Sequence, residues 1–229
     1  MNKYELVKKI EDFAPPDTAE SWDCSGWLVD SQSANVEKVM LALTVTQDVV
    51  EQARAKGCDM IISHHPLFEV PLSFKAVDIY CAHTNLDKAQ GGTTDEILRV
   101  LGFESCKIVE EFLRVVGVEI EVLTLLKKLK KISPNVRYVN NFGKTNLKKI
   151  GFCAGSGGDF IEVATTNGLD ALVTGDLKFH QALDSKIVLF DIGHFESEIL
   201  VLNVLKELIS NEVEMIFANE RSPFIKINC

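Results

Sequence analysis

Residues 38–63 read KVMLALTVTQDVVEQARAKGCDMIIS, and this stretch decides the fold class. KVMLALTV is a continuous apolar run, which is typical of a strand covered on both faces. The next segment, DVVEQARAKG, places Val49, Val50 and Ala53 on one helical face and ends at Gly57, where we expect the helix to stop. A second strand is expected over 59–63. The order strand, helix, strand predicts a βα unit of a largely parallel sheet.

The same order recurs 111 residues later. Shifting the sequence by this distance aligns 38–87 with 149–198 without a gap. The identical pairs include Lys38 and Lys149, Asp48 and Asp159, Glu51 and Glu162, Ala53 and Ala164, Gly57 and Gly168, Asp59 and Asp170, Phe68 and Phe179, and His83 and His194. Asp87 aligns with Glu198, another carboxylate. The spacing of the apolar residues also agrees between the two stretches. The alignment therefore indicates an internal duplication.

We therefore predict an α/β protein of two similar βα halves, layered α-β-α, with mostly parallel sheets. No low-complexity linker marks a boundary, so we place it after the expected helix end at Gly102, which gives halves of 1–105 and 106–229. A further helix is expected over 118–132. Segments 211–217 and 222–228 look like terminal strands, and they could complete either half, including the first.

Composition narrows the class of function. The formal net charge is −9, which argues against a nucleic-acid-binding protein. The six cysteines lie far apart with no C-x-x-C pair, so we expect reduced thiols. The N-terminus has the pattern of an amphipathic helix instead of a signal peptide, and no run of 18 apolar residues occurs. These features predict a cytoplasmic protein without a membrane span.

The five histidines suggest a metal site. His64 and His65 end an expected strand, and neighbouring residues of an extended chain point in opposite directions. Two adjacent imidazoles are therefore better placed to reach two ions than one, although an isolated pair is also compatible with one backbone-bonded and one exposed histidine. Asp87 in AHTNLD and Glu198 in GHFESE each follow a histidine by four residues, a spacing that shares one helical face.

These donors predict a dinuclear metal centre. The proposed ligands are His64, His65, Asp87, His194 and Glu198. A carboxylate that spans two ions offsets their repulsion, and Glu198 is the candidate for this role. Mixed imidazole and carboxylate ligands favour Zn, Fe, Mn, Co or Ni over Mg or Ca.

His83 and His180 are candidates for catalytic or supporting roles near the metals. His180 follows TGDLKF, which aligns in the repeat with SHHPLF. The glycine-rich stretch 155–158, GSGG, has two interpretations: a cradle of backbone amides for a phosphate, or a tight turn between strand and helix.

Taken in order, SHHPLF, AHTNLD, TGDLKFH and GHFESE resemble the motifs of the GTP cyclohydrolase I type 2 homologue family, and SWDCSGWLV resembles its opening motif. The resemblance covers nearly the whole chain. It implies two divalent ions, bridged by Glu198, and a ring-shaped homohexamer with the metals facing an inner cavity. Cys24 stands where the family commonly has asparagine, and the short segment 88–148 leaves no room for the inserted domain of longer relatives.

The function expected from this resemblance is that of a metal-dependent hydrolase. A metal-activated water would attack a nucleotide or another phosphoester, with His83 or His180 carrying protons. The alternative is a non-catalytic protein: a ring that binds or stores metal, or a scaffold for other proteins. The same fold and metal pair can host either.

Overall fold

The computed structural model describes residues 1–31 and 33–224, and they form two compact α/β units. The first unit comprises Met1–Gly92 and Val201–Arg221. The second comprises Thr93–Leu200 and the described residues from Ser222 onwards. We predicted the boundary after residue 105, which lies beyond helix α4 (Thr93–Leu101). The two units divide before α4 instead, between Gly92 and Thr93. Helix α4 belongs to the second unit because it packs on β6 (Leu113–Glu121). None of the helices in the described ranges has the length and apolar character needed to cross a membrane.

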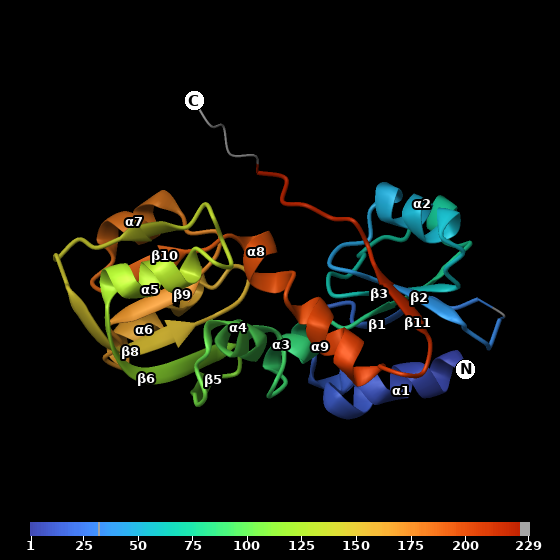
Figure 1. The fold of residues 1–229 in the computed structure, drawn as a ribbon, viewed down its shortest axis with the longest axis horizontal. Coiled ribbons are helices and arrows are strands. Elements are labelled where there is room, and N and C mark those ends of the chain that lie inside the picture. Colours follow the sequence, from blue (N-terminus) through green and yellow to red (C-terminus); the bar gives the residue numbers. More distant parts are fainter. Residues whose placement is uncertain (32, 225–229) are drawn as a thin grey trace. The chain divides into compact units, whose positions relative to one another are not determined.

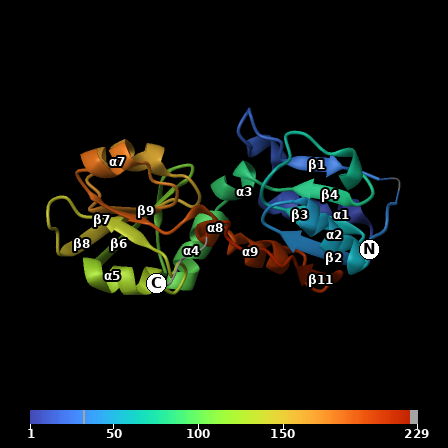
Figure 2. The ribbon, with the colours of Figure 1, turned by 90° about the horizontal axis from the view of Figure 1, so that it is seen from above.

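The first unit is built on a five-stranded sheet in the order β1-β4-β3-β2-β11 (Figures 1 and 2). All neighbouring pairs are parallel except β1 with β4. Helix α2 lies on one face and α1 and α9 on the other (Figure 1). Its elements are α1 (Lys3–Phe13), β1 (Gly26–Val29), β2 (Lys38–Ala42), α2 (Gln47–Ala55), β3 (Met60–Ser63), β4 (Asp78–Cys81), α3 (Thr84–Lys88), α9 (Val201–Leu208) and β11 (Glu214–Phe217), with short 3-10 turns at Pro16–Thr18 and Leu72–Phe74.

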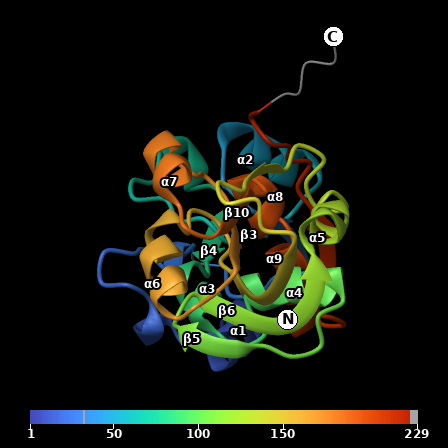
Figure 3. The ribbon, with the colours of Figure 1, turned by 90° about the vertical axis from the view of Figure 1, so that its left-hand side faces the viewer.

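The second unit has a six-stranded sheet in the order β5-β6-β8-β9-β10-β7. Helices α6 and α7 lie on one side of it and α4 and α5 on the other (Figure 3). Each side has its own apolar core. Besides α4 and β6, the elements are β5 (Lys107–Glu110), α5 (Val122–Leu129), β7 (Arg137–Val139), β8 (Asn146–Phe152), α6 (Ile161–Thr166), β9 (Ala171–Thr174), α7 (Phe179–Asp184), β10 (Val188–Asp191) and α8 (His194–Glu198), with a 3-10 turn at Gly158–Phe160.

The predicted α/β class is confirmed, with differences in detail. The second sheet is mixed, since only β8, β9 and β10 run parallel and the remaining pairs are antiparallel. The helix expected from residue 118 begins at Val122, because 118–121 belong to β6, and residues 120 and 121 pair with β8. Terminal strand β11 pairs with β2 in the first unit. Of the expected strand over 222–228, residues 222–224 form no strand, and the rest lies outside the described residues.

The repeated Gly-x-Asp has the same structural role in both units. Gly57 and Gly168 take φ of +64° and +67°, the left-handed conformation that glycine adopts without strain. Asp59 then accepts hydrogen bonds from the backbone N–H groups of residues 37 and 38, and Asp170 accepts them from those of residues 148 and 149. Each aspartate thus ties the turn after a helix to the strand that precedes the helix, which explains the identity at these positions.

Candidate metal centre

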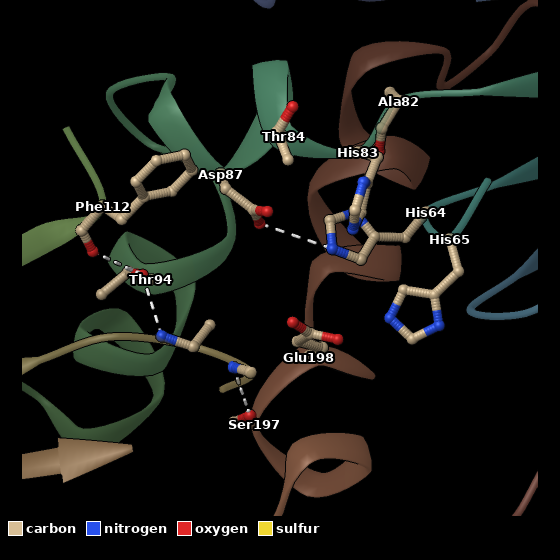
Figure 4. Close-up of polar contacts among 12 residues, drawn as sticks. His64, His65, Ala82, His83, Thr84, Asp87, Thr94, Phe112, Ser197 and Glu198 are labelled. Atoms are coloured by element: carbon tan, nitrogen blue, oxygen red, sulfur yellow. Dashed lines mark hydrogen bonds and ion pairs between the residues drawn. The ribbon is translucent and has the colours of Figure 1, made fainter. Parts of the chain in front are cut away.

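The donors of the first unit collect at the carboxyl ends of its parallel strands. His64 and His65 follow β3, His83 follows β4, and Asp87 lies on α3 directly afterwards. Ligand atoms of His64, His83 and Asp87 lie within 4.8 Å of one another (Figure 4). His64 is fully buried, and its Nε2 is 3.4 Å from Asp87 Oδ1. This edge of a parallel sheet is where α/β proteins place their binding sites.

His64 and His65 each have an oxygen atom within hydrogen-bond distance of Nδ1. His64 Nδ1 is 2.9 Å from the carbonyl oxygen of Ala82, and His65 Nδ1 is 2.7 Å from Thr44 Oγ1. A carbonyl can only accept, so His64 Nδ1 carries the hydrogen, and in the neutral form of the ring Nε2 has the lone pair. This is the arrangement that orients a metal-binding imidazole.

The segment that carries Thr44 is held in place from the end of β11. Glu220 accepts hydrogen bonds from the backbone N–H groups of Leu43 and Thr44, at 2.6 and 2.9 Å. Burial raises the pKa of Glu220, and these two hydrogen bonds act in the opposite direction. The C-terminal part of the chain therefore supports the position of His65 through Thr44.

His83 is held by Asp23, a residue that the sequence analysis did not assign to the site. Asp23 Oδ1 lies 3.0 Å from His83 Nδ1, and the Asp23 side chain has no exposed area. Burial raises the pKa of Asp23, but hydrogen bonds from Thr84, His83 and Ser25 outweigh it and hold the pKa at about 2. Burial and the neighbouring His64 lower the pKa of His83. No spacing rule connects Asp23 with His83, because their contact depends on the pairing of β1 with β4.

The second unit places its donors at the corresponding edge. His194 and Glu198 lie on α8 after β10, and His194 Nε2 is 2.9 Å from Glu198 Oε2. His194 Nδ1 is 2.8 Å from Asp176 Oδ2. The hydrogen bond to Glu198, followed by that to Asp176, outweighs burial and raises the pKa of His194 to about 9. Asp176 stands at the repeat position of His65, so the second copy has a carboxylate where the first has an imidazole.

The glycine-rich stretch 155–158 contacts Glu198 and its neighbour Ser197 through Gly155. The N–H of Gly155 donates to Ser197 Oγ, and the N–H of Gly157 donates to Thr174 Oγ1. Both amides are thus used within the protein, which supports the interpretation as a tight turn. A Cβ at Gly155 would come within 2.1 Å of Glu198 Oε1, so glycine is required for Glu198 to take this position.

His180 lies on α7 and is exposed. It lines an open hollow of the second unit together with Gln181 and Asp184 of α7, Glu162 of α6 and residues of the turn from α7 to β10. In the first unit the structure thus brings together His64, His83 and Asp87, and in the second His194 and Glu198. Within the residues that the structure describes, His180 forms no hydrogen bond or ion pair with His194 or Glu198.

The comparisons with known proteins agree with these features. The family model of Duf34/NIF3 (NGG1p interacting factor 3) matches residues 1–78 and 71–223. The chain belongs to the Duf34/NIF3 family. Two curated relatives of this Duf34/NIF3 chain are called GTP cyclohydrolase 1 type 2 homolog: one from Clostridium perfringens, 31% identical over 98% of this chain and 99% of the relative, and one from Clostridium acetobutylicum, 34% identical over 85% and 84%. The resemblance inferred from the sequence motifs is therefore confirmed.

A solved structure shares the fold over almost the whole chain. The reduced form of HcgD from Methanocaldococcus jannaschii is 25% identical, with a TM-score of 0.85 over 96% of this chain and 98% of HcgD.

Proposed function

We propose that this Duf34/NIF3 chain binds two divalent metal ions through His64, His65, Asp87, His194 and Glu198 and hydrolyses a nucleotide or another small phosphoester. One observation carries the proposal. In each unit an imidazole Nε2 faces a carboxylate oxygen, at 3.4 Å for His64 and Asp87 and at 2.9 Å for His194 and Glu198. Each of these imidazoles is also held at Nδ1 by an oxygen. A pair of this kind offers one nitrogen and one oxygen ligand to the same cation.

The chemistry of the donor set fits a divalent transition metal. Three imidazoles and two carboxylates supply the mixture that Zn, Fe, Mn, Co or Ni accepts, and the two negative charges offset part of the charge of two cations. His64 and Glu198 are both buried, where a cation would be shielded from bulk water. We assign the bridging position to Glu198 and a single ion to Asp87.

When bound, such an ion supplies Lewis acidity and can lower the pKa of a water molecule to about 7. The residues of the chain would orient the substrate and move protons. We assign the proton transfer to His83, since it adjoins His64 and Asp87 and its lowered pKa favours the neutral base at pH 7. His180 is the second candidate for this role.

The substrate class is inferred from the names of the relatives. Proteins called GTP cyclohydrolase 1 type 2 homolog are similar to this chain over nearly its whole length. A purine nucleotide is therefore the first substrate to test, followed by generic phosphoesters. By the same resemblance we expect a homohexamer, which a mass measurement in solution tests against the 25.5 kDa of one chain.

Metal content tests the ligand assignment. We expect about two divalent ions per chain in the purified protein, and Glu198→Ala should lose both because a bridging ligand serves both ions. The control is Glu196→Ala on the same helix α8, which should keep both. Full metal occupancy in Glu198→Ala would contradict the bridging assignment.

Turnover tests the activity. The metal-loaded protein is incubated with GTP and with generic phosphoesters, and loss of the purine absorbance and release of phosphate are followed. We expect turnover that requires the metals and is lost in Glu198→Ala. Two bound ions without turnover under any of the five metals would instead favour the non-catalytic alternative, a metal-storing ring or a protein scaffold.

A further inference from the structure

We propose that Asp23 is a positioning residue that fixes the tautomer and the direction of His83, so that the lone pair of its Nε2 is available at the donor cluster of the first unit. The proposal rests on the proposed function in one respect, because it takes this cluster as the place where the reaction occurs. It concerns a contact within one unit, between segments 60 residues apart in the chain.

Asp23 is surrounded by hydrogen-bond donors. Its Oδ1 accepts from the N–H of Cys24 at 2.6 Å and faces His83 Nδ1 at 3.0 Å. Its Oδ2 accepts from the N–H and the hydroxyl of Thr84, at 3.1 and 2.5 Å, and lies 2.9 Å from the Ser25 hydroxyl. A buried carboxylate with a backbone N–H at each oxygen is stabilised in its ionised form, which only accepts hydrogen bonds. His83 Nδ1 must therefore be the atom that carries the hydrogen, and Nε2 carries the lone pair.

The His83 ring is also confined by its aromatic neighbours. The rings of His64 and His65 lie 5.2 and 5.8 Å from it, and Trp22 contacts it edge to face at 6.0 Å and 75°. Its backbone N–H donates to Ser25 Oγ. Rotation of the His83 ring would therefore break the hydrogen bond to Asp23 and remove the contacts with these three rings.

The second unit meets the same requirement with an unrelated segment. His83 and His194 are equivalent in the repeat, and each has a carboxylate at Nδ1. Asp23 comes from the segment before β1, whereas Asp176 comes from the loop after β9. Packing inherited from a common ancestor would use the same segment twice. Two separate solutions point to a requirement for an oriented imidazole at this position.

The tautomer of His83 can be measured directly. Nitrogen-15 NMR of the metal-free protein, labelled at histidine, distinguishes a protonated from an unprotonated ring nitrogen, and His83→Gln identifies the signals of His83. We expect Nδ1–H with an unprotonated Nε2 in the unmodified protein, and a shift toward the Nε2–H tautomer in Asp23→Ala. The matched variant is Asp176→Ala, which should change the signals of His194 and leave those of His83 unchanged.

Asp23→Asn separates charge from shape. Because each oxygen of Asp23 faces a backbone N–H, an asparagine would turn its NH2 group toward one of these donors in either orientation. We expect Asp23→Asn to disturb the His83 signals like Asp23→Ala, despite its equal size.

The proposal is overturned if His83 keeps the same tautomer in Asp23→Ala. It is also overturned if the unmodified protein has the hydrogen on Nε2, an outcome that needs no variant to fold. Because the measurement uses neither metal nor substrate, its result is independent of whether the chain is a hydrolase.

Discussion

At the scale of single residues, the site is defined by what holds Nδ1 of each histidine. A backbone carbonyl holds His64, a hydroxyl holds His65, and carboxylates hold His83 and His194. His194 also has a carboxylate at its other nitrogen. With carboxylates at both nitrogens, its imidazole is stabilised as a cation and its pKa is raised to about 9. A metal ion that binds at His194 Nε2 would therefore have to displace a proton.

The raised pKa of His194 predicts proton release on metal binding. A cation and a proton compete for His194 Nε2, so metal affinity should rise with pH until about 9 and then level off. Calorimetry in buffers of different ionisation enthalpy should detect roughly one proton released from His194 at pH 7 to 8. In the metal-free protein the same pKa shift stabilises the fold fully below pH 6.5, and this contribution is lost as the pH rises through about 9.

Asp176→Asn provides the matched test of this explanation. It removes one of the two negative charges beside His194, so the plateau of metal affinity should move to lower pH. Asp184→Asn, an exposed carboxylate of the same unit, should leave it in place. Metal affinity that does not change between pH 6.5 and 9 would contradict the prediction.

At the scale of elements, the turns after the strands decide which side chains approach one another. Gly155, after β8, has φ of +62° and lies against Glu198 on α8. Gly143, in the turn before β8, has φ of +64° with nothing within 4 Å of its missing Cβ. The two glycines thus share a backbone conformation and differ only in their surroundings.

Substitution of these glycines separates strain from steric exclusion. Both Gly155→Ala and Gly143→Ala should destabilise the protein by roughly 1 to 2 kcal/mol, the cost of a Cβ in the left-handed region. Only Gly155→Ala should also displace Glu198 and reduce the metal content. Denaturant unfolding and metal analysis of both variants measure the two effects. Equal metal content in the two variants would show that the close approach to Glu198 has no role in binding.

At the scale of the whole molecule, a segment near the end of the chain, residues 201–221, packs with residues 1–92 in the first unit. Strand β11 adds to the edge of β2, and Glu220 beyond it binds residues 176 and 177 positions earlier. Lys9 and Lys38 form ion pairs with Glu212 and Glu214 around the same strand. Residues 201–221 are therefore a component of the first unit, and they include Glu220, which supports His65 through Thr44.

Glu220→Ala tests this long-range support. It removes the acceptor of two backbone N–H groups, so the first unit should lose about 1 to 3 kcal/mol of stability. Hydrogen exchange at Leu43 and Thr44 should accelerate, while the exposed neighbour Arg221→Ala should change neither quantity. Unchanged exchange at both amides in Glu220→Ala would contradict a supporting role for this segment.

Much of the fold could be predicted because the patterns that encode it are local. The strand, helix and strand around Gly57, their recurrence around Gly168, and the four-residue spacing of His194 and Glu198 all depend on residues near one another in the chain. Apolar periodicity and the conformational preference of glycine act over such distances. Where strand pairing overrode periodicity, as at 118–121 in β6, the prediction was wrong.

The sequence by itself thus determined the α/β class and the repeated order of strands and helices, and it supplied the residues that we propose as metal ligands. Only the tertiary structure decided how those residues are oriented. Asp23 reaches His83, and Glu220 reaches Thr44, because sheet pairing brings together segments 60 and 176 residues apart. Register and strand order are set by the packing of the complete sheet, so no spacing along the chain encodes such a contact.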